Sequence, residues 1–180
     1  MSSLILNLAD LQLGMAGLTP ARGQSFAEAA AVCLEQCAHE SSVECAITGF
    51  SPQVGELHWE AVDDQQRNTN ADLQDATEDG AAGVAILAMS ALTGLTVRER
   101  AIKNTGVDYW LGDDGASDDD LPFQNLTRLE ISGILTSSPQ NTVDRRVAQK
   151  LAQTDPTDAV APAYVAVVEF SQPRIHVEAK

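Results

Sequence analysis

The order of helical and strand patterns in the second part of the chain constrains the fold more than any other feature. The run Ala81–Leu92 predicts a buried helix, because it is apolar on nearly every face. The run Ala163–Phe170, apolar except for Glu169, predicts a central strand that is buried on both faces. Between them the patterns indicate three strands and another helix, at Leu95–Ile102, Val107–Leu111, Leu126–Leu135 and Val143–Gln153. The sequence therefore predicts an α/β (α+β) protein with a mixed central sheet and a helix–strand–strand–strand–helix–strand core flanked by helices.

The first part of the chain predicts a helix followed by a β-hairpin. Ser25 and Glu28 have the spacing of a capping box, and apolar residues recur at helical spacing over residues 24–40. Partial alternation of apolar and polar residues at 43–50 and 56–62 predicts two strands joined by a turn.

The polar, aperiodic residues 63–74 predict a connection between these two parts. A chain of 180 residues with 44% hydrophobic content can bury one sizeable core. We therefore expect one domain, residues 1–180, in which 75–180 form the core and 1–62 form an N-terminal extension.

The charge of the chain limits its partners. A formal net charge of −15 repels phosphate, so the chain alone should bind nucleic acid poorly without sequence preference. We expect a protein partner or a homo-oligomer, with nucleic acid bound only if a basic partner delivers it. The chain begins without a basic segment before an apolar run, and no apolar run is long enough to cross a bilayer. The sequence therefore predicts a cytoplasmic protein that does not enter a membrane.

Three cysteines lie close together in the sequence. Cys33 and Cys37 are one helical turn apart, Cys45 follows, and His39 lies between them. A zinc site is one interpretation, although the spacing lacks the usual Cys-x-x-Cys pair. The other interpretation is a set of buried free thiols on a helix and the next strand.

Three acidic residues lie on successive elements of the predicted core. Glu78 is near the start of a helix that Asp75 or Thr77 can cap, Asp108 lies in a predicted strand, and Glu130 lies in the next. Carboxylates gathered from separate elements are typical ligands of a hard cation such as Mg²⁺.

Each of these acids also has a purely structural interpretation. Glu78 in a first helical turn would interact favourably with the helix dipole. Asp108 could face solvent on an edge strand. Glu130 could pair with Arg128 or Arg100 across strands.

The order of the elements, together with Gly106-Val107-Asp108 and Leu129-Glu130-Ile131-Ser132-Gly133, resembles the PD-(D/E)XK superfamily, the restriction-endonuclease-like fold. The resemblance covers about the last 105 residues. It implies that Asp108 and Glu130 bind Mg²⁺ for cleavage of a DNA phosphodiester, with Glu78 as an accessory acid. The same segments, with Thr77–Ala81, also resemble a family of uncharacterised bacterial proteins.

The chain departs from this superfamily at Ser132, where the resemblance implies a lysine. A hydroxyl cannot supply the fixed positive charge that a lysine gives to a transition state. A basic residue from elsewhere could reach the site, as migrated lysines do in that superfamily. The candidates are Lys103, Arg128, Arg145, Arg146 and Lys150.

Two functions therefore stay open. The first is a Mg²⁺-dependent nuclease, or a catalytically inactive relative of one, within a bacterial assembly. The candidate catalytic residues are Asp108, Glu130, Ser132 and Glu78. The second is a noncatalytic acidic subunit that binds other proteins, which would account for both the net charge and Ser132.

Overall fold

A computed structural model describes residues 3–102, 105–113, 125–154 and 161–180, and it confirms the mixed α/β fold. The elements in chain order are β1 (Leu4–Asn7), the 3-10 helix η1 (Leu8–Leu13), α1 (Pro20–Gln36), β2 (Ser42–Gly49), β3 (Gln53–His58), α2 (Asp64–Thr69), α3 (Leu73–Thr93), β4 (Thr96–Arg100), β5 (Tyr109–Gly112), β6 (Thr127–Ile134), α4 (Val143–Thr154), β7 (Ala163–Glu169) and β8 (Arg174–Ala179).

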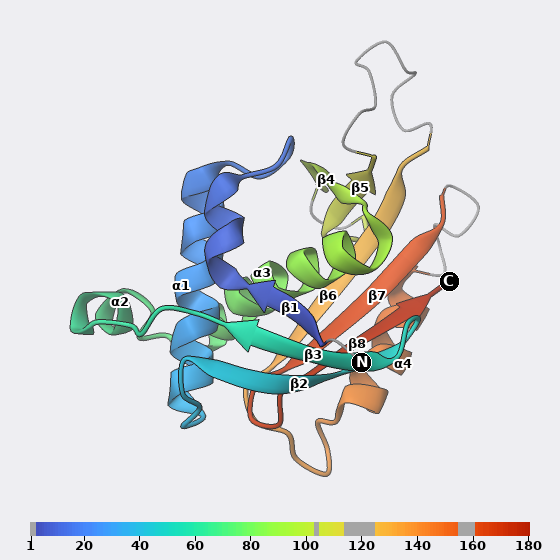
Figure 1. The fold of residues 1–180 in the computed structure, drawn as a ribbon. Coiled ribbons are helices and arrows are strands. Elements are labelled where there is room, and N and C mark those ends of the chain that lie inside the picture. The colour runs from blue at the N-terminus through green and yellow to red at the C-terminus, as the bar shows by residue number, and fades with distance from the viewer. Residues whose placement is uncertain (1–2, 103–104, 114–124, 155–160) are drawn as a thin grey trace.

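The described strands form one sheet of eight, in the order β1-β3-β2-β8-β7-β6-β5-β4 (Figure 1). Three neighbouring pairs are parallel, namely β1 with β3, β2 with β8, and β6 with β7. The other pairs are antiparallel. The predicted order of core elements is confirmed as α3, β4, β5, β6, α4 and β7, and β7 is an interior strand as expected.

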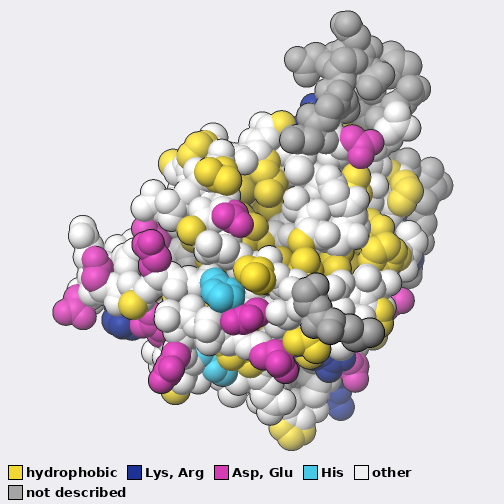
Figure 2. All heavy atoms as spheres, viewed as in Figure 1, with side chains coloured by type: hydrophobic (Ala, Val, Ile, Leu, Met, Phe, Trp, Pro, Cys, Tyr) yellow, Lys and Arg dark blue, Asp and Glu magenta, His cyan; other side chains and the backbone are white. Residues whose placement is uncertain are grey.

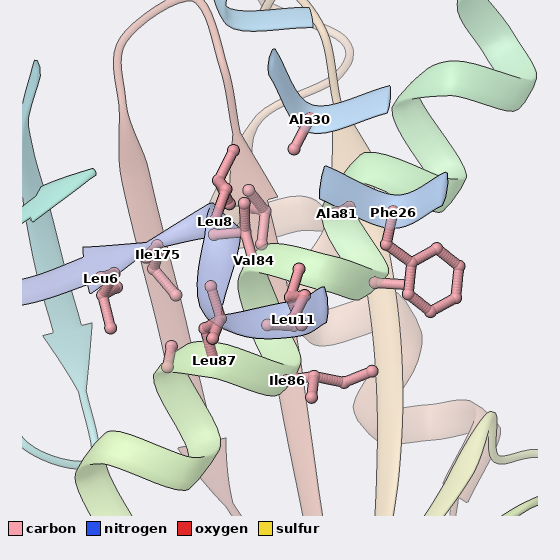
Figure 3. Close-up of a cluster of buried hydrophobic side chains, with 14 of the residues drawn as sticks. Leu6, Leu8, Leu11, Phe26, Ala30, Ala81, Val84, Ile86, Leu87 and Ile175 are labelled. Carbon is pink, nitrogen blue, oxygen red and sulfur yellow. The ribbon is translucent and has the colours of Figure 1, made fainter. Parts of the chain in front are cut away.

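The main hydrophobic core lies between one face of the sheet and the helices α1, α3 and η1. Leu8 and Leu11 of η1 meet Phe26 of α1 and Val84 and Leu87 of α3 there (Figure 3). All five side chains are buried. The N-terminal segment therefore belongs to the same core as the central helix.

A second, smaller core lies on the opposite face of the sheet, under α4. Val143 and Val147 of α4 pack against Val165 and Val167 of β7 and against Ile134 of β6. Because side chains alternate along a strand, Val165 and Val167 point to α4 while Ala166 and Val168 point to the main core. β7 is thus buried on both faces, which explains its continuous apolar sequence.

The central helix α3 ends where the sequence predicted but starts earlier. Gly94 ends it in the left-handed conformation, with φ of 76°. Asp72 caps its start by accepting hydrogen bonds from the backbone N–H groups of Gln74 and Asp75. The prediction that Asp75 or Thr77 caps this helix is therefore wrong. Glu78 lies beyond the first turn, so the helix dipole gives little reason for an acid there.

The first long helix also starts earlier than predicted. Pro20 is its first residue, and the Thr19 hydroxyl accepts the backbone N–H of Arg22 at 3.3 Å. Proline is favoured at this position because its fixed φ is helical and the missing N–H would have no partner within the helix. Ser25 lies inside α1, so the predicted capping box at Ser25 and Glu28 is wrong.

Three elements lie where the sequence pattern predicted none. β1 and η1 precede α1, and α2 lies in the segment 63–74 that was predicted to be a connection. Asp63 and Gln66 form a reciprocal capping box at the start of α2. The predicted hairpin is confirmed, because β2 and β3 pair antiparallel, although β3 ends at His58 rather than Val62.

Acidic side chains are spread over the face of the molecule seen in Figure 2, whereas Lys and Arg appear at its margins. This distribution agrees with the net charge of −15. Within the part of the chain that the structure describes, the helices are too short or too polar to span a bilayer.

Candidate functional site

The site lies where β5 begins beside the middle of β6. Tyr109, the first residue of β5, pairs with Leu129 of β6. Asp108 immediately precedes β5, so its predicted place inside a strand is wrong by one residue. Beyond this backbone pairing, the Asp108 side chain accepts the next contact with β6, from the backbone N–H of Ile131.

Asp108 makes three hydrogen bonds, two through its backbone and one through its side chain. Its backbone N–H donates to the Leu129 carbonyl at 2.9 Å, and its own carbonyl accepts the Ala101 N–H at 2.9 Å. Its carboxylate oxygen Oδ2 accepts the backbone N–H of Ile131 at 2.8 Å. The backbone thus fixes the position of this carboxylate and leaves its other oxygen, Oδ1, for further partners.

Glu130 is buried on β6 and is bound by a lysine from α4. The Lys150 ammonium donates to Glu130 Oε1 with an Nζ–O distance of 2.5 Å. The side chains of Glu130 and Lys150 are 7% and 19% exposed, so water screens this ion pair little. The suggested pairing of Glu130 with Arg128 or Arg100 is therefore not needed to explain its burial.

The two carboxyl groups interact directly. Burial is the main reason that the pKa of Glu130 rises from its ordinary value of 4.5 to about 7. The hydrogen bond from Lys150 opposes this rise, while the charge of Asp108 and a hydrogen bond shared with it add to the rise. The structure therefore places the Asp108 and Glu130 carboxyl groups in contact, and Glu130 holds its proton up to about pH 7.

This pair predicts a measurable pH dependence of stability. Because Glu130 holds its proton more tightly when folded, its contribution is most favourable below pH 4.5 and is lost as the pH rises to about 7. Asp108→Asn removes the neighbouring charge and should lower the pKa of Glu130. The measurements are a ¹³C NMR titration of the Glu130 carboxyl and urea unfolding across this pH range. Asp79→Asn is the matched control and should leave that pKa unchanged; equal shifts in both variants would contradict the prediction.

A polar cavity of about 730 Å³ opens beside this pair. Its walls come from α3, from the ends of β4 and β5, from β6 and from α4. The lining residues are Leu73, Gln74, Thr77, Glu78, Asp79, Ala82, Arg100, Asp108, Tyr109, Ile131, Ser132, Gly133, Leu135, Arg146 and Lys150. The volume falls within the range of about 300–1,000 Å³ that is usual for small-molecule sites.

The other predicted acids and the serine also line this cavity, in different settings. Glu78 is exposed on α3, whereas Ser132 is almost buried on β6, on the same face as Glu130. Ser132 lies two residues beyond Glu130, so both side chains point towards α4. The structure therefore places Glu78, Asp108 and Ser132 in the wall of one cavity, while Glu130 is buried beside it in contact with Lys150.

The structure places the basic candidates in different surroundings. Lys150 contacts Glu130 and Arg146 lines the cavity, while Arg145 is exposed and lies outside its walls. Arg128 is buried and donates to the carbonyls of Thr154 and Ala161. Lys103 lies outside the described residues.

Arg100, Tyr109 and Asp79 also line the cavity, although no sequence pattern had marked them as residues of the site. Asp79 is bound by Arg22 at 2.7 Å. Burial raises the pKa of Tyr109, and the charge of Arg100 opposes this rise. Asp79 follows Glu78 in the sequence, and Tyr109 follows Asp108. Neighbours of a site residue often line the same space, and this adjacency could have pointed to Asp79 and Tyr109.

Mg²⁺ usually binds one or two carboxylates together with waters and substrate phosphates, and Asp108 and Glu130 would supply two carboxylates. Their contact marks a place where one positive charge would relieve the repulsion of two acids. Within the described ranges, no cluster of three or more His, Cys, Asp or Glu side chains is arranged to hold a metal.

The cysteines are free thiols. Cys33 and Cys45 are buried, and Cys37 is partly buried. Burial raises the pKa of both Cys33 and Cys45 to about 12, so both hold their protons at neutral pH. A metal binds the thiolate, and the interpretation as buried thiols therefore agrees with the structure.

Comparison of the chain with family models, with curated proteins and with solved structures gives no match.

Proposed function

We propose that the cavity is the active site of a Mg²⁺-dependent nuclease that hydrolyses a phosphodiester bond. The observation that carries this proposal is the Lys150 ammonium, 2.5 Å from Glu130 Oε1, beside the Asp108–Glu130 pair. The lysine that the resemblance to the PD-(D/E)XK superfamily implies at Ser132 thus has a substitute on α4. Two carboxylates and one ammonium at a polar cavity are the groups that this chemistry uses.

Each residue has a role that follows from its surroundings. Asp108 Oδ2 is occupied by the Ile131 N–H, so Oδ1 is the oxygen available to a cation. Glu130 has a pKa of about 7, close to the optimum for accepting a proton at neutral pH. Lys150 holds Glu130 in place and supplies positive charge for the charge that develops on the phosphoryl oxygens.

Mg²⁺ bound by these carboxylates would polarise the phosphoryl group and lower the pKa of the attacking water. A cation bound here would compete with the proton on Glu130, so binding should weaken as the pH falls below about 7. Ser132 and Glu78 line the same cavity and can bind water or substrate by hydrogen bonds.

The net charge of −15 bears on how such a substrate arrives. A long polyanion is repelled by the whole molecule, and a basic partner protein would remove this barrier. We therefore extend the proposal to an assembly in which another subunit supplies the affinity for DNA and this chain supplies the reactive groups.

The proposal is tested with the purified chain, linear and supercoiled DNA, and Mg²⁺ or Mn²⁺. We expect cleavage only with metal, and we expect Asp108→Asn to abolish both the cleavage and the heat of Mn²⁺ binding in isothermal titration. Asp79→Asn is the control, because Asp79 lines the same cavity but forms an ion pair with Arg22. Unchanged heats in Asp108→Asn would remove the metal site from the proposal. Complete inertness towards DNA would favour the acidic protein-binding subunit instead.

A further inference from the structure

Two arginines face the cavity without being neutralised by a carboxylate. The side chain of Arg100 makes no hydrogen bond or salt bridge within the described part of the chain. Arg146 donates from Nε to Asn141 Oδ1 at 2.7 Å. This bond orients the guanidinium and leaves its two terminal nitrogen atoms for a ligand. Asp79, which follows Glu78 on α3 and also lines the cavity, is already paired with Arg22.

Both arginines line the cavity that Asp108 also lines. Arg146 is one helical turn before Lys150, which binds Glu130. Arg100 is the last residue of β4 and pairs with Tyr109, the residue that follows Asp108. Each arginine is therefore close in the fold to one of the two carboxylates.

The charge of the cavity differs from that of the whole chain. Among the described residues, the acids in its lining are Glu78, Asp79 and Asp108, and the bases are Arg100, Arg146 and Lys150. With Glu130, which Lys150 binds beside the cavity, the site has four acids and three bases, a far smaller excess of negative charge than the −15 of the whole chain. An anion that enters the cavity escapes the repulsion that a long polyanion would meet over the surface.

The guanidinium groups of Arg100 and Arg146 indicate which kind of anion the cavity would bind. Arginine presents paired N–H donors that match the oxygens of a phosphate, and a terminal phosphate carries more charge than a phosphate within a strand. A volume of about 730 Å³ suits a ligand the size of a nucleotide rather than a duplex. The cavity thus matches the phosphorylated end of a single strand better than the middle of a double helix.

We propose that Arg100 and Arg146 bind the terminal phosphate of a short single strand, so that the enzyme acts at phosphorylated strand ends. The reaction rests on the proposed nuclease function, whereas the phosphate binding does not. The substrate is a single strand with a terminal phosphate, and the scissile phosphodiester lies next to that phosphate, at Asp108 and Glu130.

The test measures binding in EDTA, where no cleavage takes place. The probes are a thymidine dinucleotide phosphorylated at both ends and the same dinucleotide without terminal phosphates, titrated by calorimetry. We expect the phosphorylated probe to bind more tightly, and Arg100→Gln or Arg146→Gln to weaken its binding by about tenfold to a hundredfold each. Arg145→Gln is the matched control, because it removes the same charge from an exposed position of the same helix.

The controls separate this inference from the proposed function. Equal affinities for the two probes, or equal losses in Arg145→Gln and Arg146→Gln, would overturn the phosphate site. Asp108→Asn removes a negative charge from the cavity and should preserve or strengthen binding in EDTA while it abolishes cleavage. Arginine-dependent binding in a chain that never cleaves DNA would keep the phosphate site and remove the nuclease. Cleavage that ignores both arginines would do the reverse.

Discussion

Replacing Lys150 by methionine is expected to lower metal-dependent DNA cleavage by about a hundredfold to a thousandfold, the usual cost of removing one preorganised electrostatic group. Methionine keeps an unbranched side chain on α4 but lacks the ammonium that lies 2.5 Å from Glu130 Oε1. The variant also loses the hydrogen bond that holds down the pKa of Glu130, so that pKa should rise above about 7. The measurement is the initial rate on linear DNA at saturating Mg²⁺ as a function of pH.

Arg145→Met is the matched control for this experiment. It removes a cation from the same helix at an exposed position outside the cavity, and its rate should equal that of the unaltered chain. Lys150→Arg keeps the charge in a different shape and should recover part of the rate. If Lys150→Met and Arg145→Met cleaved equally fast, Lys150 would be a structural residue and the substitution for the missing lysine at Ser132 would be wrong.

Gly133→Ala is expected to lower the free energy of unfolding by about 2–3 kcal/mol, because it overpacks the contact between β6 and α3. A Cβ at Gly133 would lie 2.6 Å from the Thr77 carbonyl oxygen and 2.9 Å from Ala81 Cβ. Both belong to the buried side of α3, whose backbone cannot yield without moving the helix. Urea unfolding at constant pH gives the change in free energy.

Gly112→Ala is the comparison that isolates this cause. A Cβ there would meet Leu126 Cδ2 at 2.9 Å and Arg98 Cγ at 3.1 Å, both on side chains that can rotate away. Its cost should stay below about 1 kcal/mol. Equal losses in the two variants would show that side-chain volume in the sheet, rather than the close approach of α3, sets the cost.

The sequence predicted well the elements whose pattern has a single physical explanation. The helix before Gly94 is apolar on every face, and only a helix buried between the sheet and other helices satisfies that pattern. The strand Ala163–Glu169 is apolar over its central residues Val165–Val168 because both of its faces are covered. Local chemistry and tertiary position agree in these elements, so the pattern was sufficient.

The N-terminal region was predicted less well because several signals competed. Thr19 with Pro20 and Ser25 with Glu28 are both valid helix starts, and the structure uses the earlier one. β1 has only four residues and is defined by its pairing with β3, which lies about fifty positions away. No local pattern reports such a pairing.

The carboxylates of the site could be proposed from the sequence, but their cation could not be selected. Five basic residues were candidates, and spacing alone did not distinguish them. Val143, Val147 and Leu151 share the face of α4 that packs on the sheet, and this packing rotates Lys150 towards Glu130 and Arg145 towards solvent. The choice depends on the crossing of α4 over β6, which is a property of the folded protein.

The two halves of the site rest on packing of very different extent. Asp108 and Glu130 lie at or in the sheet that borders the main core. Lys150 and Arg146 lie on α4, which packs on the sheet through the few apolar side chains of the second core. Local opening of a region costs less free energy when fewer buried contacts hold it, so α4 should detach more readily than the sheet unfolds. The positive charges on α4 can then move away together while the acids stay on the sheet, so the ion pair between Glu130 and Lys150 should break before the sheet unfolds.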